Sequence, residues 1–316
     1  MDDSNNLKRI LDQAADAYDK GNWDDATELY TQAYGMRQSF DINQGLAASL
    51  LNSKRADEAE AVILDYFNYY LSDPEAASLA TDIVIENNDY LLANQMLYFY
   101  ATNPLSTIQK TFIDGFENRV RISESRHIRS FKPRMKQIEE SLNSIVTQPI
   151  IDQIQLIRSL REFDIENYLR SAKNLLGNPL LHPLLKSETV ENLFKLGINE
   201  DIDISFYGEN KKFNPSKLKP ILSTSVYLEM CDELEKILVD SENEVQLENM
   251  RSELSLYAAM VYPFGEDIIK TPTLWTRVFL LRYGLLDESL VGDDPELPEV
   301  KKWIKRFDSL INTFQQ

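Results

Sequence analysis

The sequence predicts an all-α protein, in which a solenoid of helical hairpins is followed by a helical domain with one small β-hairpin. Three observations lead to this fold class. Glycine and proline number only 10 and 12 among 316 residues, which leaves little material for the turns of an all-β protein. Small and aromatic residues recur at intervals of 33 and 34 residues near the N-terminus. Apolar and polar residues alternate as in a strand within residues 201–213.

The repeated pattern predicts three helix-turn-helix units, at residues 7–39, 40–73 and 74–105. In each unit a small residue follows a short polar turn, and a second one stands twelve positions upstream. A large side chain would push two closely crossing helices apart, so we expect these small residues to be buried at helix crossings. They are Ala14 and Ala26, Ala47 and Ala59, and Thr81 and Ala93.

A period of about 34 residues with this pattern resembles the tetratricopeptide repeat. The first unit matches best, whereas the second and third lack the turn glycine and part of the aromatic pattern. The later segment NPLLHPLLKSETVENLFKLGI resembles uncharacterised tetratricopeptide-like (TPR-like) proteins of low-GC Gram-positive bacteria. The resemblance implies a repeat array joined to an α-helical domain, and it brings no catalytic residues with it. The matching residues of the first unit are Ala14, Gly21, Trp23, Ala26, Tyr30 and Ala33.

The rest of the chain divides into three predicted parts. Residues 106–148 should form connecting helices with a basic segment at 119–136, broken at Lys132-Pro133. Residues 149–285 should form the helical domain, with the β-hairpin near 201–213. A first group of helices should end at Gly177, and the next helix should have Pro183 in its first turn and Gly197 just past its end. Further helices should cover about 216–239, 243–261 and 272–284.

Residues 286–316 are predicted to form an acidic connector and a C-terminal amphipathic helix. One stripe of that helix is apolar. The stripe either covers the exposed end of the solenoid or mediates dimerisation or partner docking. Its residues are Val300, Trp303, Ile304, Phe307, Leu310, Ile311 and Phe314.

Charge and residue usage exclude several classes of function. The net charge of −18 argues against nucleic acid as the main ligand and against docking on an anionic membrane. The N-terminal MDDSNNLKRI lacks the basic and apolar regions of a signal peptide, so we expect a cytoplasmic protein. Glycine-rich phosphate-binding motifs are absent, and we predict no cofactor.

The titratable residues predict no catalytic or metal site. Cys231 is the only cysteine, and His127 and His182 are the only histidines and belong to no metal-binding motif. A calcium loop at 201–213 is rejected, because Phe206 stands where such a loop needs glycine and Lys212 where it needs glutamate. His182 precedes Pro183 at a helix start, where capping or packing is favoured over catalysis.

The resemblance also implies a ligand-binding groove, lined by the first helix of each unit. Five of the implied residues are acidic and one is basic. The positions that clamp acidic chaperone tails in the family hold Leu11, Ala15, Gly45, Glu75 and Leu79 here, so that role is not supported. The groove residues are Lys8, Leu11, Ala15, Tyr18 and Asp19; Asp41, Gln44, Ala48, Leu51 and Asn52; and Glu75, Ser78, Asp82, Ile85 and Glu86.

We therefore predict a non-catalytic adaptor, scaffold or chaperone-like factor that binds a basic or amphipathic segment of a protein or peptide. The alternative is that the groove residues form only a solvent-exposed acidic surface that binds no ligand. The rival functions are an enzyme with its site in residues 137–284, around the hairpin and His182, and a structural protein self-associating through the 300–314 stripe. The basic segment 119–136 either packs as an exposed long helix or docks on the acidic repeats of the same chain.

Overall fold

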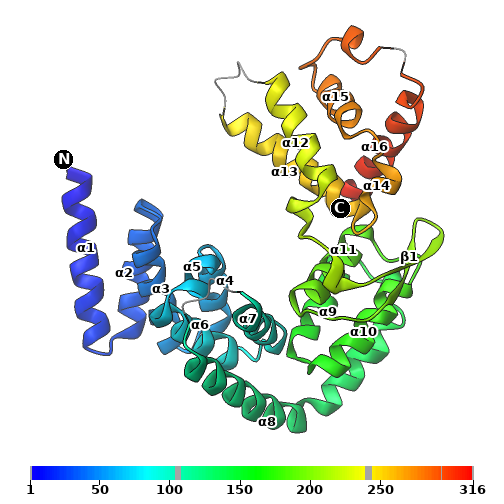
Figure 1. Ribbon diagram of the computed structural model, residues 1–316. Helices are drawn as coiled ribbons and strands as arrows, with labels where there is room; N and C mark the ends of the chain where they lie inside the picture. The colour runs from blue at the N-terminus through cyan, green and yellow to red at the C-terminus, as the bar shows by residue number, and fades with distance from the viewer. Residues whose placement is uncertain (1, 104–107, 239–243, 293, 315–316) are drawn as a thin grey trace. The chain divides into compact units, whose positions relative to one another are not determined.

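The computed structural model describes residues 2–103, 108–238, 244–292 and 294–314 (Figure 1). The chain divides into two compact units. The first comprises Met1–Lys136 and Leu160–Tyr168, and the second comprises Gln137–Ser159 and Leu169–Gln316. The prediction of an all-α chain with a small hairpin is confirmed.

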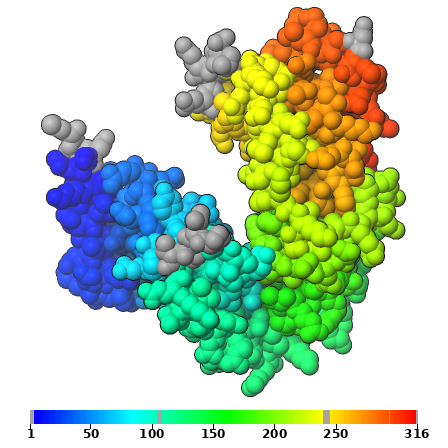
Figure 2. Space-filling model, in the orientation of Figure 1, coloured from blue at the N-terminus to red at the C-terminus, as the bar shows by residue number. Residues whose placement is uncertain are grey.

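The first unit is a stack of antiparallel helical hairpins in chain order (Figure 1). The space-filling view shows successive repeats as one continuous surface from blue to cyan (Figure 2). The helices are α1 (Asp2–Asp19), α2 (Trp23–Met36), α3 (Phe40–Asn52), α4 (Ala56–Leu64), α5 (Phe67–Ser72), α6 (Pro74–Glu86), α7 (Tyr90–Thr102) and α8 (Lys110–Leu142).

The small residues predicted at helix crossings are all buried with 0% exposure, from Ala14 to Ala93. The contact between α2 and α3 shows why small size matters there. The ring of Tyr30 lies over Gly45, where a Cβ atom would stand only 2.6 Å from the Tyr30 Cε1. The predicted packing role of this pattern is therefore confirmed.

The turn within each hairpin has the same backbone conformation in all three repeats. Gly21, Lys54 and Asn88 occupy equivalent positions with φ angles of 76°, 61° and 56°. In each turn, the following N–H donates to the carbonyl five residues earlier, as from Arg55 to Leu50. This is the Schellman pattern, in which a left-handed residue ends a helix. The second and third repeats keep the turn geometry without the glycine.

Two parts of the first unit differ from a regular array. The second helix of the second repeat is divided into α4 and α5 around Asp65 and Tyr66. The predicted break at Lys132-Pro133 is wrong, because α8 runs through Pro133 over 33 residues. Phe131 and Met135 on either side are both buried, and this packing maintains the helix where proline removes one hydrogen bond. The predicted end of the third repeat, at residue 105, lies outside the described residues.

The second unit contains the β-hairpin and most of the remaining helices. Strands β1 (Ile202–Phe206) and β2 (Glu209–Phe213) pair antiparallel, with Ile202 opposite Phe213. The helices from residue 150 onward are α9 (Ile150–Arg158), α10 (Ile165–Gly177), α11 (Pro183–Lys195), α12 (Ser225–Ile237), α13 (Glu244–Val261), α14 (Gly265–Ile268), α15 (Pro272–Arg282) and α16 (Leu297–Ile311).

The predicted hairpin and the Pro183 helix are confirmed, whereas the predicted helix over 216–239 begins later. Residues 215–217 and 221–223 form short 3₁₀ turns, and α12 starts at Ser225. Pro220 lies inside the predicted span and interrupts it, and the Thr224 hydroxyl caps the helix by accepting from the Tyr227 N–H. The predicted boundaries at 239 and 243 lie outside the described residues.

Helix α16 packs inside the second unit. Val300, Ile304 and Phe307 are buried, and Phe307 has 0% exposure. The Phe307 ring contacts those of Trp275 and Tyr257, with centroid distances of 5.6 and 5.4 Å. The central part of the predicted stripe thus packs on the core of its own unit.

Candidate functional site

The first helices of the repeats present the residues that were predicted to line a groove. We call this surface the first-helix face. Every predicted residue on it is at least partly accessible. The exposed ones are Lys8, Ala15, Asp19, Asp41, Asn52, Glu75, Ser78 and Glu86, and the half-buried ones are Leu11, Tyr18, Gln44, Ala48, Leu51, Asp82 and Ile85.

Polar contacts join these first helices to one another, roughly one repeat apart in sequence. The Asn52 side-chain amide donates to the Tyr18 hydroxyl over 3.1 Å and links α3 to α1. Lys54, just after α3, lies 3.4 Å from the Glu86 carboxylate at the end of α6. The Arg119 guanidinium on α8 forms an ion pair with Asp82 on α6. The N-terminal part of α8 therefore follows α1, α3 and α6 as a fourth first helix.

The basic segment 119–136 combines the two arrangements that were considered for it. Arg119 binds Asp82, so the segment does contact the acidic repeats of its own chain. Its other basic side chains lie along the exposed side of α8 and include Arg126, Arg129 and Lys132. The segment thus contacts the repeats through Arg119 and also through the His127 ring, whose centroid lies 5.6 Å from that of Tyr90, whereas Arg126, Arg129 and Lys132 are exposed.

Comparison with known proteins agrees with this geometry. Residues 17–83 match the family model of the tetratricopeptide repeat. Residues 17–83 are thus similar to tetratricopeptide repeats. The matched residues begin at the end of α1 and extend into α6, which places the family signature on the first-helix face and the helices that support it.

A curated relative extends the similarity beyond the repeats. The TPR repeat-containing protein YsoA of Bacillus subtilis (strain 168) is 21% identical over 290 residues. The aligned region covers 84% of this chain and 80% of the relative. No solved structure shows a significant match. The similarity to this relative therefore extends over both the repeats and the helical region after them.

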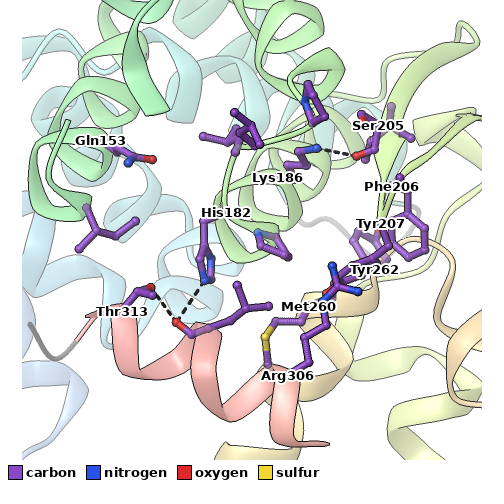
Figure 3. A pocket seen from close by; sticks show the side chains of 18 residues that line it. Gln153, His182, Lys186, Ser205, Phe206, Tyr207, Met260, Tyr262, Arg306 and Thr313 are labelled. Carbon is purple, nitrogen blue, oxygen red and sulfur yellow. Dashed lines mark hydrogen bonds between the residues drawn. The ribbon is translucent and has the colours of Figure 1, made fainter. Parts of the chain in front are cut away.

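The second unit contains a cavity beside the hairpin, with a volume of about 560 Å³ (Figure 3). Helices α9, α11, α13 and α16 and strand β1 contribute to its walls. This is the region in which an enzyme site was considered as the rival function. His182, predicted as a capping or packing residue, lies in its wall.

Both nitrogens of the His182 ring are engaged by main-chain groups. Nδ1 accepts from the Leu184 N–H over 3.2 Å, which caps α11, and Nε2 lies 3.3 Å from the Leu310 carbonyl oxygen. Burial lowers the pKa of His182 to about 4, so the imidazole is neutral at neutral pH. The predicted capping role is confirmed, and this ring has no free nitrogen for proton transfer.

The phenols of the cavity wall are also engaged. Tyr207 donates to the Met260 carbonyl and Tyr262 to the Lys219 carbonyl, each over 2.9 Å. Cys231 is buried on α12, outside the cavity lining, and burial raises the pKa of its thiol. A buried thiol with a raised pKa has the character of a packing residue.

Sequence reasoning missed both charged residues of the cavity lining, Lys186 on α11 and Arg306 on α16. Lys186 carries a detectable signal, because it lies between Leu185 and the buried Val190 on the apolar face of its helix. A lysine at such a position is expected to be buried. Arg306 carries no such signal, since charged residues surround it in KKWIKRF.

The described residues were also searched for membrane-spanning and metal-binding features. None of their helices combines the length and the apolar character that crossing a membrane requires. In the same ranges, no three or more His, Cys, Asp or Glu side chains gather as a metal site would need.

Proposed function

We propose that the protein is a non-catalytic adaptor, scaffold or chaperone-like factor of the bacterial cytoplasm, and that its first-helix face binds a basic or amphipathic segment of a partner protein. The match to tetratricopeptide repeats supports a role in protein interaction. The observation that carries the finer proposal is the accessibility of every residue predicted on this face.

The chemistry of the face suits a basic segment with apolar side chains. Asp41 and Glu75 lie exposed in the first turns of α3 and α6. Leu51 and Ile85 are half-buried in the last turns of the same two helices and pack on the core of the repeats. Carboxylates attract and orient a basic partner, and apolar contacts add affinity that salt does not screen.

The cavity of the second unit does not lead us to propose an enzyme. His182 is the residue that the sequence offered as an acid–base candidate there, and both of its nitrogens are bound by main-chain groups. We therefore propose ligand binding and not catalysis for both units.

The experiment is a comparative pull-down from a bacterial lysate, with retained proteins identified by mass spectrometry. The test variant is Asp41→Lys/Glu75→Lys, which leaves the ion pair between Asp82 and Arg119 intact. The control is Asp25→Lys/Asp57→Lys, which makes the same charge change at exposed first-turn residues of the second helices α2 and α4. Both pairs share the penalty for placing lysine at a helix N-terminus.

Retention of a basic protein by the wild type and the control, and its loss from the test variant, is the expected result. The interaction should weaken between 50 and 300 mM salt, roughly as expected for exposed charges. Equal retention by both variants would show that the first-helix face is only a solvated acidic surface. Loss from both variants would indicate a general charge effect and would also contradict the proposal.

A further inference from the structure

The cavity beside the hairpin carries positive charge without any negative charge of its own. Among the described residues that line it, Lys186 and Arg306 are cationic and none is Asp or Glu. The whole chain has a net charge of −18, so this local composition opposes that of the protein. A cavity with such a lining attracts anions at short range.

Lys186 is a buried cation with an incomplete set of partners. Its exposure is 6%, and its ammonium donates to the Ser205 carbonyl over 2.5 Å (Figure 3). An ammonium has three donors, and no carboxylate of the described residues lies within ion-pair distance of it. Burial lowers the pKa of Lys186 to about 8, which still leaves the charged form dominant at neutral pH. An anion beside it would offset the cost of burying this charge.

Arg306 reaches the same cavity from α16 and is held by aromatic rings. Its guanidinium carbon lies 4.6 Å from the centroid of the Tyr207 ring and 5.0 Å from that of Trp303. Stacking of this kind orients the guanidinium and leaves its N–H donors free in the plane. Such a group suits a carboxylate or a phosphate, which it can bind through two parallel hydrogen bonds.

The remaining wall of the cavity is mainly apolar. Ile150, Leu181, Ile204, Phe206 and Met260 contribute to it. The other polar side chains near the cations, His182, Tyr207 and Tyr262, already bond to main-chain groups. A volume of about 560 Å³ lies within the range of small-molecule sites.

We propose that this cavity binds a small organic anion, in which a carboxylate or phosphate group contacts Lys186 and Arg306 and an apolar body contacts the surrounding wall. This inference is independent of the protein-binding role of the repeats. It gives the second unit a ligand of its own, recognised by two cations from α11 and α16.

The test uses four probes with the same eight-carbon chain and different head groups: octanoate, octyl phosphate, octan-1-ol and octylamine. Their affinities for the full-length protein are measured by isothermal titration calorimetry. At least one of the two anions should bind roughly tenfold more tightly than the alcohol, as expected for a charge-assisted hydrogen bond, and the amine should not bind. The better of the two anions identifies the head group.

Two variants assign the effect to the proposed residues. Arg306→Gln and Lys186→Met should each weaken binding of that anion by roughly tenfold and leave binding of octan-1-ol unchanged. Lys305→Gln is the matched control, because Lys305 is an exposed neighbour on α16 that does not line the cavity. Arg306 is exposed, so its variant keeps the test valid should Lys186→Met fail to fold. Absence of binding by both anions, equal affinity for the alcohol, or unchanged affinity in Arg306→Gln would overturn the proposal.

Discussion

Arg161 donates a hydrogen bond from Nη1 to Oε1 of Glu60 over 3.0 Å, although 101 positions separate the two residues in sequence. The same guanidinium nitrogen lies 3.9 Å from the carboxylate of Asp89. Both carboxylates are buried, Glu60 on α4 and Asp89 at the start of α7. One cation from the segment Leu160–Tyr168 therefore lies beside two buried carboxyl groups of the repeat array.

Arg161→Leu should lower the free energy of unfolding by roughly 2 kcal/mol, because it leaves buried carboxylates without their cation. This value is below that of a fully buried pair, since the Arg161 side chain is 35% exposed. Urea denaturation followed by circular dichroism measures the loss. Arg129→Leu, at an exposed position of α8, serves as the control and should change stability little. In a Glu60→Gln background the same substitution should cost less, and an equal cost would contradict the proposed coupling.

Stability should also depend on the protonation of Asp89. Burial, and then the negative charge of Glu60, raises the pKa of Asp89 to about 7 in the folded chain. The folded state thus holds a proton that the unfolded state releases near pH 4. The resulting stabilisation is complete below that pH and is lost as the pH rises through about 7.

Asp89→Asn tests this dependence, because the amide oxygen can still accept the capping hydrogen bond from the Leu92 N–H. The midpoint of thermal unfolding of the wild type should fall between pH 5.5 and pH 8, and the fall should be smaller in the variant. Burial also raises the pKa of Glu124 to about 7, so Glu124 should cause part of the pH dependence of the unfolding midpoint that remains in the variant. Identical slopes in both proteins would show that Asp89 does not titrate in this range.

The three turns share one backbone conformation, so removing a glycine from one turn and introducing a glycine into another should change the free energy of unfolding in opposite directions. Gly21→Ala should destabilise the protein by about 1 kcal/mol, since its φ angle of 76° disfavours a Cβ atom. Lys54→Gly should stabilise it by up to about 1 kcal/mol for the same reason. Lys54→Ala is the control, because it also removes the exposed ion pair with Glu86 but retains a Cβ atom. A loss of stability in Lys54→Gly equal to that of Lys54→Ala would contradict this interpretation.

The central residue of the C-terminal stripe should behave as a core residue. Phe307→Ala should cost roughly 3–5 kcal/mol, as truncation of a buried aromatic ring does, whereas Phe314→Ala should cost much less because Phe314 is 36% exposed. Denaturation curves of the two variants provide the comparison. Light scattering of the wild type over a hundredfold range of concentration should give a constant mass. An increase towards a dimer that Phe314→Ala abolishes would support self-association through the stripe.

The repeats could be predicted because their signals are local. Residues such as Ala26 and Ala59 show a small side chain at a fixed interval, and burial at a helix crossing follows from size alone. The hairpin was predictable for a similar reason, since Ile202 and Ile204 alternate with polar neighbours. The continuous course of α8 was not predictable, because the packing of Phe131 and Met135 outweighs the local effect of Pro133.

The residues of the two candidate sites also differ in how far the sequence could predict them. Those of the first-helix face follow from the repeat alignment, which assigns each one to a helix side. Lys186 and Arg306 lie in separate helices of the second unit, and no spacing in the chain relates them. His182 lies in the same cavity, and the sequence predicted a capping or packing role for it, because Pro183 beside it indicates a helix start.

The sequence by itself determined the helical hairpins, their turns and the acidic character of the repeats, since these depend on side-chain size, backbone preference and charge within about 34 residues. The tertiary structure alone decided which charged and polar groups meet, as in Arg161 with the Glu60 carboxylate and Lys186 with the Ser205 carbonyl. The physical reason is that desolvation and Coulomb interactions depend on distances in space, which only the packed chain defines.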